Sequence, residues 1–257
     1  MNYYISHSAD AGIRKKINQD CGFVEKAISK AGKLVFAVLC DGMGGFSRGE
    51  EASRTIVDAF SRWFYENMPK YTDEEITRQL ITEQWTSVIR SVNSSILSEA
   101  TKSGEKMGST VTALLLLHDR YFLLNIGDTR AYRIGESNMT QLTTDHTLVE
   151  EQIRLGKLTR QQAEVSPVRN VLTKCVGAVE NAVPDFFFGE TACGEAYVLC
   201  TDGFRHVLSP EEIKEALYTN TLSDISCLAS EERRLIELNM QRGEKDNISV
   251  ITILTRE

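Results

Sequence analysis

The sequence predicts an α+β fold in which antiparallel sheets pack against each other and helices cover the outside. Three observations lead to this prediction. Along the 257 residues, helical patterns occur in pairs, strand patterns occur in short consecutive groups, and the two do not alternate one by one. A parallel sheet would require that alternation. With 42% hydrophobic residues and only 4 prolines, the chain has the composition of a globular protein that can bury a core.

The first predicted elements are a buried strand and two helices. Residues 33–40 are rich in Val, Leu and Phe, which is typical of a strand buried on both faces. Residues 48–65 place apolar side chains at helical spacing, and a proline shortly afterwards ends this helix. A second helix is predicted over residues 73–100, with Thr72 as its cap and Glu75 completing a capping box.

The middle of the chain changes to strand patterns. Residues 110–117, 121–126 and 130–134 are short β-rich runs, and we predict that they form a meander of antiparallel strands. The segment 144–173 is more polar and is predicted to be helical in part, with a Ser-Pro pair interrupting it.

The C-terminal part returns to strands and ends on one. Strand patterns cover residues 183–188, 196–200 and 248–254, and two helices are predicted between the last two strands, over about 210–218 and 223–240. There is no internal repeat, low-complexity tract or recognisable linker. This organisation favours a single domain over residues 1–257.

Charge and composition exclude several classes of function. The net charge is −7, and the sequence has no cluster of basic residues of the kind that follows a phosphate backbone. Nucleic acid is therefore a poor candidate for a partner. No apolar run approaches the ~20 residues needed to cross a bilayer, and the N-terminus lacks the apolar core of a signal peptide. The six cysteines contain no Cys-x-x-Cys pair and are interpreted as the reduced thiols of a cytoplasmic protein with no membrane association.

Aspartates recur at the ends of the predicted strands. Asp41 ends one strand in VLCDGMGG, Asp202 ends another in YVLCTDGF, Asp128 follows residues 121–126, and Asp246 opens the last strand. Each aspartate alone is more typical of a turn. Four of them on separate strands are different, because adjacent strands can bring their ends together at one sheet edge. Clustered carboxylates repel each other unless a cation holds them.

The residue types at these strand ends favour a hard divalent cation. Carboxylates, a backbone carbonyl and water are the oxygen ligands that suit Mg²⁺ or Mn²⁺, and the four histidines stand alone without a zinc spacing. Two such ions ~4 Å apart, bridged by a carboxylate, would activate a water and stabilise a phosphoryl transition state. Gly42 matters in this interpretation because a residue without a side chain lets its carbonyl oxygen reach a metal.

An ordered set of motifs makes the chain similar to a known family. The motifs are NQD (18–20), CDGMGG (40–45), GST (108–110), GDTR (127–130), LTTDHT (142–147), RNVLT (169–173), CTDGF (200–204) and DNISV (246–250). Each motif alone is a weak signal, whereas the set in this order is highly specific. The chain resembles the metal-dependent serine/threonine protein phosphatases of type two C, in their compact bacterial single-domain form.

The resemblance implies a fold and a metal centre. The fold would be a four-layer α/β/β/α sandwich of two antiparallel sheets flanked by helices, with the metals in a cleft at one end. Two Mn²⁺ or Mg²⁺ ions per chain are implied, with Asp41 bridging them and the Gly42 carbonyl completing the second site. By the same likeness, Asp202 and Asp246 ligate the first metal, and Asp128 with Asp202 forms a weaker third site.

The resemblance also implies a reaction and its partners. Asp20 would accept hydrogen bonds from metal-bound water. The reaction would be the hydrolysis of phosphoserine or phosphothreonine by a metal-activated water, with no phosphoenzyme intermediate. The substrates would be phosphoproteins, in particular those made by a serine/threonine kinase, and the enzyme would act as a monomer. Residues 144–173 correspond to the family's variable flap beside the cleft, which influences the choice of substrate.

Two positions depart from the family pattern. Where the family usually places an arginine for the substrate phosphate, this chain has Lys15, with Arg14 one residue earlier. Arginine binds phosphate through two nitrogens and lysine as a point charge, and we prefer Arg14, because a one-residue slip in the loop would present it. Met43 stands where many eukaryotic relatives carry a histidine that is discussed as a general acid, and methionine cannot donate a proton.

Two alternative functions compete with this interpretation. Cys227 and Arg233 satisfy the Cys-x5-Arg pattern of cysteine phosphatases. The intervening LASEE carries two carboxylates that would repel a phosphate, so we interpret the match as chance on a helix. The second alternative is a catalytically inactive relative that only binds phosphoproteins. A pure binding module has no evident need for four aspartates at strand ends.

Overall fold

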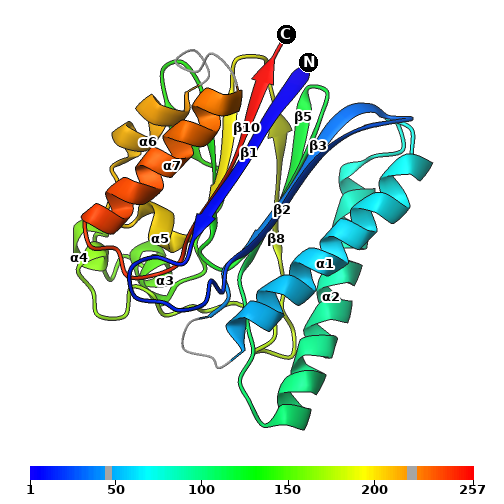
Figure 1. The fold of residues 1–257 in the computed structure, drawn as a ribbon. Helices are drawn as coiled ribbons and strands as arrows, with labels where there is room; N and C mark the ends of the chain where they lie inside the picture. The colour runs from blue at the N-terminus through cyan, green and yellow to red at the C-terminus, as the bar shows by residue number, and fades with distance from the viewer. Residues whose placement is uncertain (44–47, 219–224) are drawn as a thin grey trace.

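Two antiparallel sheets lie face to face between two layers of helices (Figure 1). The computed structural model describes residues 1–43, 48–218 and 225–257, and within these residues each sheet has five strands. All strand pairings in both sheets are antiparallel. The predicted α+β sandwich of four layers is therefore confirmed.

The chain contributes alternately to the two sheets. The first sheet consists, in spatial order, of β1 (Asn2–Asp10), β10 (Ile248–Arg256), β9 (Ala196–Cys200), β6 (Arg130–Ile134) and β7 (Met139–Gln141). The second consists of β2 (Cys21–Ser29), β3 (Gly32–Cys40), β4 (Val111–Leu117), β5 (Arg120–Ile126) and β8 (Asp185–Glu190).

The helices form the two outer layers and one wall near the end of the sandwich. The second sheet is covered by α1 (Gly49–Asn67), the short 3₁₀ helix η1 (Met68–Lys70) and α2 (Arg78–Ser103). The first sheet is covered by α5 (Asp202–Arg205), α6 (Pro210–Leu217) and α7 (Ile225–Gln241). Two short helices, α3 (Leu148–Arg154) and α4 (Arg160–Glu164), lie in the segment 144–173, as the sequence predicted.

Strand β3 shows why the core has three layers of apolar side chains. Its residues Leu34, Phe36 and Val38 face α1 and α2, whereas Val35 and Leu39 face the other sheet. Neighbouring side chains of a strand point to opposite faces, so a strand between a helical layer and a sheet is apolar at every position. The uninterrupted apolar run in the sequence is the consequence of this double burial.

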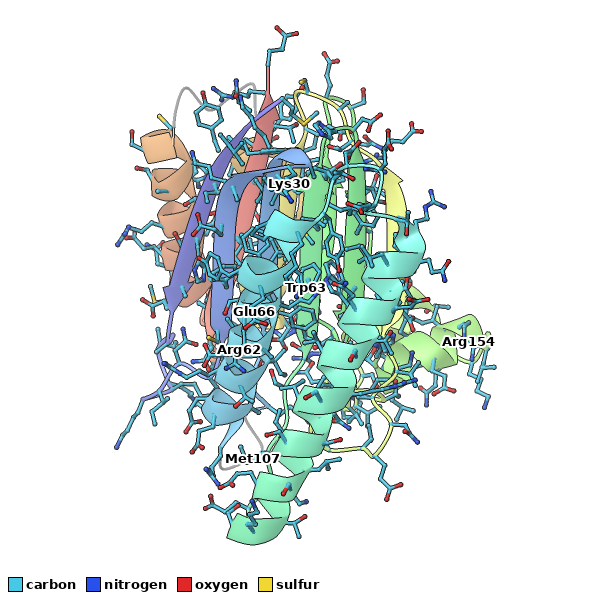
Figure 2. The ribbon with its side chains drawn as sticks, turned by 90° about the vertical axis from the view of Figure 1, so that its right-hand side faces the viewer. Lys30, Arg62, Trp63, Glu66, Met107 and Arg154 are labelled. Carbon is cyan, nitrogen blue, oxygen red and sulfur yellow. The ribbon has the colours of Figure 1, made fainter. Side chains whose placement is uncertain are left out.

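Aromatic rings join the second sheet to its helices. Figure 2 shows α1 and α2 side by side over the sheet, with Trp63 labelled on α1. The Trp63 and Trp85 rings meet edge to face with centroids 5.5 Å apart, and the Phe36 ring lies 5.3 and 5.7 Å from them. Offset and edge-to-face aromatic pairs add to the stability that burial itself provides.

Three details of the predicted elements were wrong or missed. The strands at 110–117 and 121–126 pair as β4 and β5, but β6 joins the other sheet, so there is no three-stranded meander. The reason is the turn at Gly127, whose φ of 108° directs the chain across to the first sheet. The edge strands β1, β2 and β7 are not predicted, because each is only partly buried and lacks a regular apolar alternation.

The start of the second long helix was also misplaced. Thr72 and Glu75 do interact, through hydrogen bonds of 2.8 and 2.9 Å to the Glu75 carboxylate, but they stabilise a turn that precedes the helix. Helix α2 begins at Arg78, where the Thr77 hydroxyl accepts from the Leu80 N–H at 3.1 Å. No helix among the described residues is both long and apolar enough to cross a membrane. No disulfide joins the six cysteines, all of which are described.

Candidate metal centre

The predicted site aspartates meet at one end of the sandwich. Asp41 follows β3 and Asp128 follows β5, both in the second sheet, whereas Asp202 begins α5 directly after β9 and Asp246 precedes β10 in the first sheet. This end lies opposite the chain termini (Figure 1). Sequence reasoning expected the strand ends to meet at the edge of one sheet, and that detail was wrong. The carboxylates converge from two facing sheets.

Electrostatics show that these side chains are close. Burial raises the pKa of Asp41 well above its ordinary value, and the charges of Asp20, Asp202, Asp128 and Asp246 raise it further. Burial likewise raises the pKa of Asp20 and of Asp128 to about 7, with the Asp202 carboxylate contributing to both. Five carboxylates therefore lie within electrostatic reach of one another. A divalent cation among them would reverse this effect, because it favours the ionised form.

The polar atoms of the site fit a hard cation with its water. Oδ1 of Asp20 and Oδ1 of Asp202 are buried and have no hydrogen-bond partner among the described residues, and both are oxygen ligands of the type that Mg²⁺ and Mn²⁺ prefer. Within the same residues, no three acidic, imidazole or thiol side chains are close enough to hold an ion directly between them. The two unpartnered oxygens therefore fit a hard cation with its water, and the side chains around them would have to close in to ligate it directly.

The GST motif holds Asp41 in place. The Asp41 N–H donates to the Thr110 hydroxyl at 2.9 Å, and the Asp41 carbonyl accepts from the Ser109 hydroxyl at 2.8 Å and the Thr110 N–H at 2.9 Å. The Gly42 N–H donates to the Gln19 carbonyl at 3.1 Å, which joins this turn to the NQD motif. Gly44 and Gly45 of the same motif lie outside the described residues.

Asn247 anchors the N-terminal loop that carries the candidate phosphate ligands. Its Oδ1 accepts from the Gln19 N–H at 2.9 Å, and its Nδ2 donates to the carbonyls of Ala11 and Ile17 at 3.0 and 3.2 Å. The Thr201 hydroxyl donates to Asp20 at 3.1 Å. Sequence reasoning gave Asn247 no role. The available signals were its place in the DNISV motif and its position beside Asp246 at the start of an apolar strand.

A cleft of about 960 Å³ is lined by two of the five site aspartates, while Asp20, Asp41 and Asp202 are not among its lining residues; both Arg14 and Lys15 line it. The Lys15 ammonium is 3.1 Å from Oδ1 of Asp246, whereas the exposed Arg14 makes no ion pair with any residue that the structure describes. Asp128 and Asp246 also face this cleft. The segment 144–173 provides one wall, with Asp145, Thr147, Val149, Glu150, Ile153, Arg160, Ala163, Glu164, Arg169 and Asn170.

Sequence reasoning gave no role to three further cleft residues, Arg205, His206 and Glu244, although the first two directly follow the CTDGF motif. Arg205 lies 3.8 Å from the Asp128 carboxylate and also donates to the Asp128 carbonyl at 3.2 Å. The His206 ring lies between two carboxylates, 3.5 Å from Asp202 and 3.4 Å from Glu244. Burial alone would raise the pKa of Glu244, but hydrogen bonds from His206 and from two backbone amides lower it to about 2.

The Cys-x5-Arg match does not form a phosphate cradle. Cys227 and Arg233 both lie on α7, and the Cys227 side chain packs against the core between this helix and the first sheet. Backbone N–H groups inside a helix are used by the helix itself and are not free to bind phosphate. Met43, whose N–H donates to the Gly108 carbonyl at 3.0 Å, is placed beside Gly42.

Comparison with known proteins agrees with this architecture. The family described as protein phosphatase 2C matches residues 12–241. The serine/threonine protein phosphatase PstP of Mycobacterium tuberculosis is 31% identical over 245 residues, which are 95% of this chain. The chain spans only 43% of the length of that relative.

Solved structures give the same result. The serine/threonine phosphatase of S. agalactiae superposes with a TM-score of 0.85 at 30% identity, covering 99% of this chain and 100% of that one. The catalytic domain of PstP in complex with two manganese ions has a TM-score of 0.78 at 27% identity, with 99% of both chains covered. The strand-end aspartates, the four-layer fold and these similarities lead to one assignment: the chain belongs to the protein phosphatase 2C family of serine/threonine protein phosphatases.

Proposed function

We propose that this protein hydrolyses phosphoserine and phosphothreonine in proteins with a water activated at a dinuclear Mn²⁺ or Mg²⁺ centre. The observation that carries the proposal is the convergence of five carboxylates from two facing sheets onto one end of the sandwich. The PstP catalytic domain, whose solved complex contains two manganese ions, supports the choice of cofactor. The buried and unpartnered Oδ1 atoms of Asp20 and Asp202 support it from this chain itself.

The residues have distinct roles in this proposal. Asp41 and the Gly42 carbonyl, together with Asp202 and Asp246, would hold the two ions, with Asp41 shared between them, Gly42 at the second and Asp202 and Asp246 at the first. Asp128 would hold a weaker third ion together with Asp202. When bound, the ions supply a nucleophilic water and neutralise developing charge on the phosphoryl group.

The remaining parts of the site orient water and substrate. The Asp20 carboxylate, held by the Thr201 hydroxyl, keeps Oδ1 available to accept a hydrogen bond from water at the centre. The cleft receives the phosphorylated segment of a protein substrate, the product of a serine/threonine kinase. Residues 1–257 act as one catalytic domain, and the segment 144–173 is the flap that forms the cleft wall and influences which substrates fit.

Metal dependence tests the proposal. Wild-type protein should hydrolyse a phosphothreonine peptide in Mn²⁺ or Mg²⁺ and should be inactive in EDTA. The variant Asp202→Asn should be at least about 100-fold slower, because it removes one charged ligand of the first ion. A folded wild type that is silent in every metal but retains phosphopeptide binding would instead identify an inactive phosphoprotein-binding relative.

Phosphate binding distinguishes Arg14 from Lys15. We expect Arg14→Ala to raise KM for the phosphopeptide about 10-fold. Its guanidinium faces the cleft, forms no ion pair with the described residues and can bind phosphate through two nitrogens. Lys15→Ala should change KM less, since its ammonium is engaged by Asp246. Steady-state kinetics measures both effects, with the exposed neighbour Lys16→Ala as the matched control. A larger KM effect for Lys15→Ala would reverse the assignment.

A further inference from the structure

His146, in the LTTDHT motif, joins the turn at Gly127 to the flap segment 144–173. Its ring Nδ1 accepts a hydrogen bond from the Gly127 N–H at 3.0 Å. Its own backbone N–H donates to the Gly127 carbonyl at 2.9 Å. The side chain is buried, with 6% of the residue exposed. One histidine therefore satisfies both backbone groups of the glycine that immediately precedes Asp128.

The hydrogen bonds determine the state of the ring. A backbone N–H can only donate, so Nδ1 carries no proton and Nε2 carries it. Nε2 donates to the Asp185 carboxylate at 3.0 Å, and the other Asp185 oxygen accepts from the Lys174 ammonium at 2.7 Å. Burial lowers the pKa of His146, which favours this neutral ring. Every polar atom of the imidazole is thus bonded, and its orientation is fixed.

The same histidine is attached to the far end of the flap segment. Its carbonyl accepts from the Thr173 N–H at 2.8 Å, and the next residues pair in a short antiparallel bridge between Thr147 and Leu172. Lys174, which follows this bridge, reaches back to Asp185. Residues 172–174 are therefore linked to His146 in two ways: by the hydrogen bond to its backbone carbonyl, and through Asp185, which binds both Lys174 and the His146 ring.

The turn that His146 holds has little freedom of its own. Gly127 has a φ of 108°, and a Cβ there would overlap the side chain of Thr110, the residue that holds Asp41. Beyond the turn, Arg130 is bound by Asp145, the neighbour of His146, with a closest distance of 2.7 Å. The Asp145 carboxylate and the His146 imidazole of LTTDHT thus bind the GDTR motif on both sides of Asp128, at Arg130 and at Gly127.

We propose that His146 is a positioning residue that fixes the Gly127–Asp128 turn and couples it to the flap, so that cation binding at Asp128 depends on this histidine. The inference rests on the proposed function for its metal readout, but not for the hydrogen bond that it assigns. The proposed function gives His146 itself no role, and this arrangement assigns it one.

Two variants distinguish the roles of Nδ1 and Nε2, because each amide side chain can replace only one of the two ring nitrogens. In His146→Asn the amide oxygen can occupy the position of Nδ1 and accept from Gly127. In His146→Gln the amide reaches the position of Nε2, so the contact with Asp185 is kept and the acceptor for Gly127 is lost. The first readout uses the protein in EDTA: hydrogen exchange of the Gly127 amide should accelerate at least about 10-fold in the glutamine variant, the loss of about one hydrogen bond. It should change little in the asparagine variant.

The second readout is Mn²⁺ binding, followed by the electron paramagnetic resonance signal of free Mn²⁺. Asp128→Ala identifies the ion that depends on Asp128. His146→Gln should weaken the binding of that same ion about 10-fold, which is the usual effect of removing a group that orients a ligand. The affinity for the more tightly bound ions should not change. If His146→Gln does not fold, Asp185→Ala replaces it, because that carboxylate is 39% exposed. This variant removes the acceptor of His146 Nε2 and should weaken binding of the same ion.

The outcomes are separable from those of the proposed function. Equal exchange of the Gly127 amide in the glutamine and wild-type proteins would overturn the assigned hydrogen bond, whether or not the protein is a phosphatase. Accelerated exchange with all ions weakened equally, or with none weakened, would overturn the coupling to Asp128. Accelerated exchange in a protein that binds no Mn²⁺ would uphold the structural link and remove its metal-binding role together with the proposed function.

Discussion

Replacement of Asp41 by asparagine should lower kcat/KM for a phosphothreonine peptide by at least about 10³-fold, which corresponds to about 4 kcal/mol of transition-state stabilisation. The effect should exceed that of Asp202→Asn, because in the proposed centre Asp41 serves both ions and Asp202 serves one full site. Asparagine has the same shape as aspartate but lacks the charge and the second anionic oxygen. The hydrogen bonds that hold the Asp41 backbone do not involve its side chain and should remain.

The same variant should be more stable than wild type in EDTA. Burial and four neighbouring carboxylates raise the pKa of Asp41 in the folded state, so an ionised Asp41 costs stability above the ordinary pKa of an aspartate. Asparagine removes that cost, and the gain should disappear at acidic pH, where Asp41 is protonated in the folded state. Thermal melting at pH 7.5 and pH 4 measures both effects, with the exposed Asp119→Asn as control. Retention of more than a tenth of the activity would contradict the bridging role.

Gly42→Ala should impair both folding and catalysis. A Cβ at residue 42 would lie 2.5 Å from the carbonyl oxygens of Gln19 and Gly49, which are backbone atoms that cannot move aside cheaply. We expect the free energy of unfolding to fall by about 3 kcal/mol, the upper end for overpacking. Activity should fall at least about 100-fold, because a shift of the Asp41–Gly42 turn displaces two proposed ligands together.

Urea denaturation and phosphopeptide kinetics in saturating Mn²⁺ test this expectation. Gly135→Ala is a matched control, since a Cβ at that turn would meet only the Asn138 side chain, at 3.6 Å. It should change stability by less than about 0.5 kcal/mol. If Gly42→Ala matched this control in both measurements, the close approach of the three backbone segments around Gly42 would not be required for the site.

Much of the fold and the candidate site could be predicted from local patterns. The apolar run before Asp41 predicts a strand because it is buried on both faces, and the helical spacing after residue 48 predicts α1 because one face packs on the sheet. The aspartates were identified by their position at strand ends, where a turn leaves the carboxylate at the edge of a rigid element. Each of these patterns involves only residues that are close together in the sequence, so it can be recognised without knowing the fold.

Other features depend on contacts between distant segments. Edge strands β1 and β2 carry only a weak pattern, and β6 resembled the third strand of a meander although it pairs with β9 in the other sheet. The local motif predicts a helix cap at Thr72, whereas Thr77 caps α2 in the folded chain. In each case local propensity was compatible with several arrangements and packing selected one.

The sequence by itself determined which residue types the site contains: the carboxylates, the glycine beside Asp41 and the pair of basic residues at 14 and 15. Only the tertiary structure decided that Asp41 and Asp128 face Asp202 and Asp246 across two sheets, that Lys15 meets Asp246, and that His146 holds the turn before Asp128. The physical reason is that the charge and hydrogen-bonding groups of a side chain are set by its residue type. Which side chains come into contact depends on how the two sheets pack.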